Sequence, residues 1–87
     1  MIEIVDYYAD WCPPCRKLKP VLEDVEKELG GRVKVRKVNV DEDREEAIEM
    51  GIGGIPTIVF FKNGKEVDRM VGPQSKQEII RTVEKHE

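Results

Sequence analysis

The chain has 87 residues, a formal net charge of −3 and similar shares of hydrophobic (39%) and charged (38%) residues. This length suits one domain, residues 1–87, with a core of modest size. No apolar run is long enough to span a membrane, no start resembles a signal peptide, and the mixed charges offer no basic surface for nucleic acid. We therefore expect a cytoplasmic protein.

A nearly continuous apolar run at residues 2–9 predicts a buried strand covered on both faces. Asp6 interrupts this run, and an ionised carboxylate there would be costly without a partner. The next segment, Trp11–Cys15, reads Trp-Cys-Pro-Pro-Cys and holds the only two cysteines of the chain. Two cysteines at this spacing cannot form a disulfide scaffold; at a strand-to-helix junction they indicate a redox or metal-binding pair.

A helix is predicted to begin at the cysteines, because prolines in the first turn lose no hydrogen bond. Its apolar residues share one face: Leu18, Val21, Leu22, Val25 and Leu29. Pro20 interrupts the pattern and predicts a kink, and Gly30-Gly31 predicts the end of the helix.

Residues 32–40 predict a second strand, and the charges of Lys34 and Arg36 are typical of a sheet edge. A short helix follows over residues 43–50, with Asp41 or Asp43 as its cap. We interpret the acidic residues 41–46 as the solvated start of this helix.

Residues 57–61 and 65–71 predict two antiparallel strands, joined by a tight turn at Asn63-Gly64. Residues 75–78 read Ser-Lys-Gln-Glu, a capping-box pattern that opens a last helix. This helix should bury Ile79, Ile80 and Val83, while His86 near the chain end should be solvated. The predicted order is strand, helix, strand, helix, strand, strand, helix.

Taken together, these motifs resemble the thioredoxin family over nearly the whole chain. The motifs that carry the resemblance are Asp6, Trp11–Cys15, Pro20, Lys37-Val38-Asn39, Gly54-Ile55-Pro56-Thr57, Phe61-Lys62-Asn63-Gly64 and Gly72. The resemblance implies an α/β thioredoxin fold of βαβαββα order, in which three helices flank a four-stranded mixed sheet.

Two features depart from the family pattern. Cys12-Pro13-Pro14-Cys15 replaces the usual Cys-Gly-Pro-Cys, as in tryparedoxin and nucleoredoxin relatives. Thioredoxins also usually begin with an extra strand and helix, for which this sequence has no room. Our hypothesis is that the chain is a naturally compact member of the family.

The resemblance implies a thiol–disulfide oxidoreductase that reduces protein disulfides. Cys12 would attack as a thiolate, since a helix N-terminus favours negative charge, and the more buried Cys15 would resolve the mixed disulfide. Asp6 would act as a general base that relays a proton for Cys15 through water, because desolvation raises its pKa towards neutrality, and Lys37 would be its partner. From the residues alone, Asp6 reads as a solvent-facing strand residue and Lys37 as an ordinary edge charge.

The substrate would bind beside the cysteines. Ile55-Pro56 matches the family's cis-proline loop, although only about 5–6% of X–Pro bonds are cis in general. The backbone of this loop would lie against Cys12 and pair with an extended peptide. The expected substrate-binding residues are Trp11, Pro13, Pro14, Gly54, Ile55, Pro56 and Gly72, with Val40 beside them. We assign Tyr7, Tyr8, Phe60 and Phe61 to the core, and Met50 and Met70 to packing.

The expected partners are disulfide-containing proteins and an electron donor such as a thioredoxin reductase. No cofactor and no metal are expected, because the cysteine pair carries the electrons, and we expect a monomer. Pro13 and Pro14 remove two N–H donors, which should raise the Cys12 pKa, and they stiffen the turn, so the redox potential stays open.

Other functions remain as alternatives. Within the same chemistry they are a disulfide oxidant or isomerase, a donor dedicated to one peroxidase, and a glutaredoxin-like protein that uses glutathione. In other classes they are a zinc-binding module, for which the chain has only one histidine, and a non-catalytic interaction domain.

Overall fold

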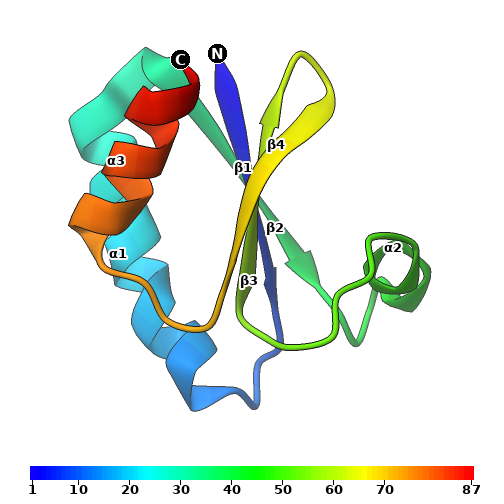
Figure 1. Ribbon diagram of the computed structural model, residues 1–87. Helices are drawn as coiled ribbons and strands as arrows, with labels where there is room; N and C mark the ends of the chain where they lie inside the picture. The colour runs from blue at the N-terminus through cyan, green and yellow to red at the C-terminus, as the bar shows by residue number, and fades with distance from the viewer.

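The computed structural model describes residues 1–87, and its elements follow the predicted βαβαββα order. They are β1 (Ile2–Tyr8), α1 (Pro13–Leu29), the 3₁₀ turn η1 (Gly30–Arg32), β2 (Val33–Asn39), α2 (Arg44–Glu49), β3 (Thr57–Lys62), β4 (Lys65–Val71) and α3 (Lys76–His86). Figure 1 shows both chain termini at one end of the sheet, and the connections that follow β1, β2 and β4 at the other.

The four strands form one mixed sheet in the order β2-β1-β3-β4. β1 pairs in parallel with β2 and antiparallel with β3, so it is hydrogen-bonded along both sides. β2 lies at an edge, as the charges of Lys34 and Arg36 predict. Parallel pairing puts the C-terminal ends of β1 and β2 together, which brings the segments after them side by side.

The two long helices cover one face of this sheet, and α2 lies on the other side (Figure 1). The main hydrophobic core lies beneath α1 and α3. It consists of Ile2, Ile4, Leu18, Leu22, Val25, Leu29, Val33, Ile58, Phe60, Ile79 and Val83. A smaller cluster on the opposite face consists of Val5, Tyr7, Val38 and Val59, with Met50 and Phe61 packed against it. β1 is therefore buried on both faces, as its apolar run predicts.

Local signals in the sequence are confirmed where they concern turns and caps. Asn63 and Gly64 both have positive φ, 54° and 78°, which is the geometry of a tight hairpin turn. The Ser75 hydroxyl accepts a hydrogen bond from the Glu78 N–H at 3.1 Å, and the Glu78 carboxylate accepts from the Ser75 N–H at 3.4 Å. Both halves of the capping box are present.

Two details of the predicted helices are wrong. Asp43 occupies the N-cap position of α2 but its side chain makes no capping bond, and Asp41 is engaged elsewhere. Ile80 is only half-buried, and Thr82 faces the core instead while its hydroxyl donates to the Glu78 carbonyl oxygen at 2.9 Å. This backbone bond satisfies the Thr82 hydroxyl, which makes its burial tolerable.

His86 is not solvated. Its Nε2 lies 3.0 Å from the Asp68 carboxylate on β4, and only 21% of its side chain is exposed. The reason is topological, because α3 runs back along the sheet and ends beside β4. The hydrogen bond with His86 holds the pKa of the Asp68 carboxyl below its usual range.

Tyr8 and Phe61 are half-buried rather than core residues, whereas Tyr7 and Phe60 are fully buried. None of the helices is both long enough and apolar enough to cross a membrane.

We predict that Leu22→Ala lowers the free energy of unfolding by about 2–5 kcal/mol, because Leu22 is fully buried between α1 and the sheet and its truncation leaves a cavity. Glu23→Ala, one position along the same helix but exposed, should change it by less than about 0.5 kcal/mol. Urea denaturation followed by far-ultraviolet circular dichroism measures both. Equal effects of the two variants would contradict the assignment of Leu22 to the core.

Candidate active site

The two cysteines are placed by the start of α1. Cys12 is the N-cap residue, Pro13 and Pro14 open the helix, and Cys15 completes its first turn. The Cys15 N–H donates to Cys12 Sγ at 3.3 Å. Because the two prolines carry no N–H, this is the main-chain donor that the first turn offers to the sulfur. The cysteines form a disulfide, with their Cα atoms 5.2 Å apart.

Both cysteines are buried, which corrects the expectation that Cys15 is the more protected one. Cys12 is 3% exposed and Cys15 4%. They cluster with Ala9, and Tyr8, Val40 and Ile55 pack against this cluster. The neighbours explain the burial of Cys12, since it lies beneath side chains from other segments instead of standing free at the helix end.

The loop before β3 lies against Cys12. The Ile55–Pro56 peptide bond is cis, as the resemblance implies, and the Ile55 carbonyl oxygen is 4.0 Å from Cys12 Sγ. The Gly72 N–H donates to the Pro56 carbonyl oxygen at 2.7 Å, and the Thr57 hydroxyl donates to the Gly54 carbonyl oxygen. These bonds bring the loop and the end of β4 to the same place beside the dithiol.

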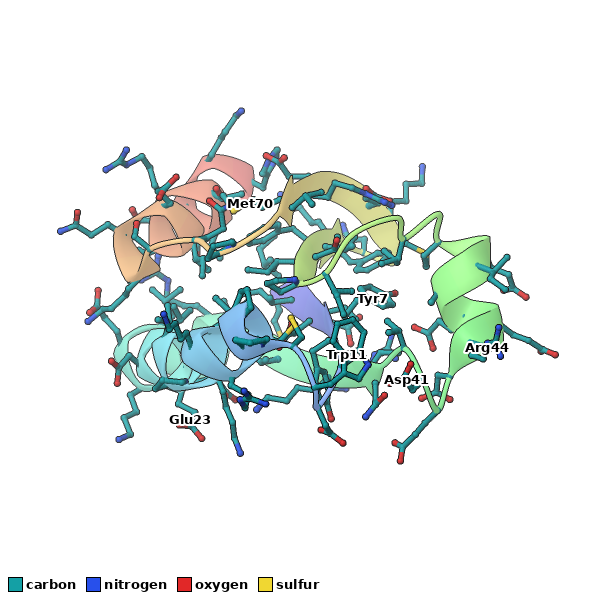
Figure 2. All side chains as sticks on the ribbon, turned by 90° about the horizontal axis from the view of Figure 1, so that it is seen from below. Tyr7, Trp11, Glu23, Asp41, Arg44 and Met70 are labelled. Atoms are coloured by element: carbon teal, nitrogen blue, oxygen red, sulfur yellow. A yellow bond between two sulfur atoms is a disulfide. The ribbon has the colours of Figure 1, made fainter.

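The apolar side chains of Trp11, Ile55 and Val71 lie on the segments next to the buried sulfurs, and we call these three residues the rim. Trp11 is 65% exposed, and its indole N–H donates to the Asp41 carboxylate at 2.9 Å. Figure 2 shows the two side chains together between α1 and α2. Val71, at the end of β4 and 63% exposed, adds a residue that the sequence analysis did not single out. Large apolar side chains that face solvent beside a reactive group indicate a contact surface.

Asp6 lies on β1 and is 2% exposed, so the solvent-facing interpretation is wrong. Its Oδ1 has no hydrogen-bond partner in the protein. Desolvation raises the pKa of this carboxyl from 3.8 to about 6, and the positive charge of Lys37 offsets part of that rise. Lys37 is the register partner of Asp6 on β2, but it is exposed and forms no ion pair with it.

A pocket of about 500 Å³ contains both the acid and Cys15. Its lining residues are Asp6, Tyr8, Ala9, Asp10, Cys15, Arg16, Lys19 and Lys37. Asp10, Arg16 and Lys19 were not predicted as site residues, although Lys19 follows Cys15 by four residues and such pairs share a helix face. The pocket therefore places a carboxyl of near-neutral pKa and the second cysteine in one enclosure.

A disulfide-forming Cys-x-x-Cys pair at a helix N-terminus, beside a cis-proline loop and an exposed rim, defines a thiol–disulfide oxidoreductase of the thioredoxin-like kind. The thioredoxin family model matches residues 2–85. The chain thus belongs to the thioredoxin family. As a member with an intact cysteine pair it is a protein-disulfide reductase, and this assignment is favoured over a zinc-binding module or a non-catalytic interaction domain.

Individual relatives agree with this assignment. Thioredoxin from Rickettsia conorii is 44% identical over 82 residues, which are 94% of this chain and 78% of that one. Thioredoxin from Chlamydia caviae is 45% identical over 83 residues, with 95% and 80% covered. Among solved structures, thioredoxin from Fasciola hepatica is 38% identical with a TM-score of 0.90, over 99% of this chain and 81% of that one. A mutant thioredoxin from Halobacterium salinarum gives a TM-score of 0.90 at 36% identity, over 97% and 73%.

The raised pKa of Asp6 predicts a pH-dependent cost in stability. The Asp6 carboxyl has a pKa near 3.8 in the unfolded chain and about 6 in the folded protein. Its contribution to the free energy of unfolding is therefore fully present below pH 3.8 and is lost as the pH rises through about 6. Replacing the acid by Asp6→Asn should remove the cost. We expect the stability of the variant relative to the unmodified protein to rise by up to about 3 kcal/mol between pH 4 and pH 8.

Chemical denaturation of both oxidised proteins at several pH values measures this difference. Asp24→Asn, at an exposed position on α1, is the matched control and should show no such trend. A pH-independent difference for Asp6→Asn would mean that the buried carboxyl keeps an ordinary pKa.

Proposed function

We propose that Cys12 is the nucleophile that reduces disulfides of partner proteins and that Cys15 is the resolving cysteine. The observation that carries this assignment is the position of Cys12 as the N-cap of a 17-residue helix, next to the Ile55 carbonyl oxygen. The partial positive charge of the helix N-terminus and the Cys15 N–H both stabilise a thiolate there. Cys15 lies at the end of the first turn of the same helix, and its sulfur is within bonding distance of Cys12 Sγ.

The reaction is two successive thiol–disulfide exchanges. The Cys12 thiolate attacks one sulfur of the substrate disulfide, forms a mixed disulfide and releases the other sulfur as a thiolate. Cys15, once deprotonated, attacks Cys12 Sγ, forms the Cys12–Cys15 disulfide and releases the second substrate thiol. The protein gives up two electrons, and the substrate gains two electrons and two protons.

Asp6 is the base for the second step in this proposal. Its carboxyl shares the pocket with Cys15, and a pKa of about 6 leaves it mostly ionised at neutral pH yet able to accept a proton. Lys37 supplies the positive charge that keeps this carboxyl from a still higher pKa. Lys37 acts on Asp6 through the field of its charge rather than through a hydrogen bond.

The substrate would bind as an extended strand over the rim. The Ile55 backbone lies beside Cys12, and Gly54 and Gly72, which lack side chains, leave it open to a peptide. Trp11, Pro13 and Val71 are exposed around it and would contact the substrate side chains. Pro14 and Pro56 hold the turn and the loop in place.

We further propose that residues 1–87 act as one monomeric domain in the cytoplasm. An external electron donor, such as a thioredoxin reductase, would reduce the Cys12–Cys15 disulfide after each turnover, so the protein takes part in electron transport without a bound cofactor.

The roles of the two cysteines predict that Cys15→Ser traps its substrate. Without the resolving thiol, the mixed disulfide on Cys12 should accumulate when the reduced variant meets an oxidised protein such as insulin. Intact-mass spectrometry with and without dithiothreitol measures the adduct. Cys12→Ser should form little adduct, and preferential trapping by that variant would reverse the two roles.

The reductase role predicts a reduction potential below that of the glutathione pool, more negative than about −260 mV. Equilibrium titration against glutathione buffers, followed by Trp11 fluorescence, measures it, because Trp11 directly precedes Cys12. A potential above about −200 mV would instead support an oxidant or isomerase.

A further inference from the structure

The short helix α2 has few apolar contacts to hold it in place. It has six residues, of which only Ala47 is buried, and Ile48 points to solvent with 73% of its surface exposed. Helices of this length are not stable by themselves in water. The position of α2 against the sheet must therefore depend on specific polar contacts and on the chain at its two ends.

One such contact comes from Glu46, in the first turn of α2. Its Oε2 accepts a hydrogen bond from the Tyr7 hydroxyl at 3.1 Å and another from an Arg36 Nη2 at 3.1 Å. Tyr7 is fully buried on β1, and Figure 2 shows its ring extending towards α2. Burial, together with the bond to Glu46, raises the pKa of Tyr7 to about 12, so this hydroxyl remains a donor.

The hydrogen bonds from Tyr7 and Arg36 to Glu46 differ in strength. The Arg36 side chain is 44% exposed, and ion pairs at such positions are weakened by solvent. The Tyr7 hydroxyl extends from a buried ring and meets a charged acceptor, and such bonds are stronger than neutral ones. The Tyr7–Glu46 bond is thus the main link between α2 and the sheet, with Arg36 as support.

A second link holds the other end of the helix. The Arg69 guanidinium donates to the Met50 carbonyl oxygen at 3.0 Å, directly after the last residue of α2. Glu66 accepts two hydrogen bonds from the same guanidinium, at 2.6 and 2.8 Å, and so orients it. The helix is therefore attached at its start to β1 and β2 and at its end to β4.

This helix connects two parts of the dithiol rim. Asp41, which accepts from the Trp11 indole, lies three residues before α2. Ile55, whose carbonyl oxygen faces Cys12, lies six residues after it. A displacement of α2 would therefore also move Asp41, which holds Trp11, and Ile55, on the two sides of the substrate surface.

We propose that Glu46 is a positioning residue for disulfide exchange: its bond with the Tyr7 hydroxyl fixes α2 and thereby the Trp11 and Ile55 sides of the substrate surface. This role rests on the proposed function, because it concerns binding of a protein substrate at that surface. Glu46 touches neither cysteine, so it acts through the helix. The acidic residue that we assigned to a solvated helix start is in fact a link to the core.

The test is Glu46→Ala, with Glu45→Ala as the matched control, since Glu45 is the preceding residue on the same helix and is exposed. We expect Glu46→Ala to raise KM for insulin roughly three- to tenfold while kcat changes little. Reduction of hydroxyethyl disulfide, which is too small to use the rim, should be unaffected, as should the redox potential. Glu45→Ala should match the unmodified protein in every assay.

Two further variants separate positioning from general damage. Tyr7→Phe removes only the hydroxyl and should raise KM as Glu46→Ala does. Glu46→Gln keeps an acceptor for that hydroxyl, so its KM should stay close to that of the unmodified protein. If Glu46→Ala and Tyr7→Phe both keep the KM of Glu45→Ala, the proposal is overturned.

Amide hydrogen exchange tests the same link without any enzymatic assay. The Met50 and Ile52 N–H groups donate to the Glu46 and Ala47 carbonyl oxygens at the end of α2. In Glu46→Ala these two amides should exchange faster, while those of Val5 and Val59 in the sheet should not. Unchanged exchange at Met50 and Ile52 refutes the link, whereas failure of the unmodified protein to reduce insulin refutes the proposed function instead.

Discussion

The strand β1 is the constraint on which the rest of the structure depends. It is hydrogen-bonded on both sides and buried on both faces, so its register and direction are fixed by the core itself. Its C-terminal end delivers the chain to Cys12, its residue Asp6 faces the pocket, and its residue Tyr7 points to the opposite side, towards α2. One buried strand therefore positions both the reactive groups, Cys12 and Asp6, and the Tyr7 hydroxyl that holds α2.

The active site contains polar groups that lack the hydrogen-bond partners found elsewhere in the fold. A buried carboxylate oxygen without a partner is rare in folded proteins, and Asp6 has one. The two prolines after Cys12 similarly leave the helix start with fewer N–H donors for a sulfur anion. Such local costs are expected where function, rather than stability, selects the residue. The long α1 and its packing on the sheet supply the stability that offsets them.

Much of the fold was predictable because its signals are local. Helical spacing, the Asn63-Gly64 turn and the Ser75–Glu78 box act within a few residues, and all three are confirmed. The contacts that were missed join segments far apart in the chain, such as Trp11 with Asp41 and His86 with Asp68. No periodicity encodes these pairs. The burial of Asp6 and the cis bond at Pro56 became predictable only through the resemblance to a family.

Polar anchoring of α2 achieves something that apolar burial would not. The hydrophobic effect is non-directional, so an apolar face would hold the helix near the sheet without specifying its rotation. A hydrogen bond from the Tyr7 hydroxyl to Glu46, by contrast, weakens steeply when the geometry is wrong. A second polar contact, from Arg69 to the Met50 carbonyl oxygen, restricts the other end. Two directional contacts at opposite ends define the orientation of a six-residue helix, and with it the spacing between the Trp11 and Ile55 sides of the rim.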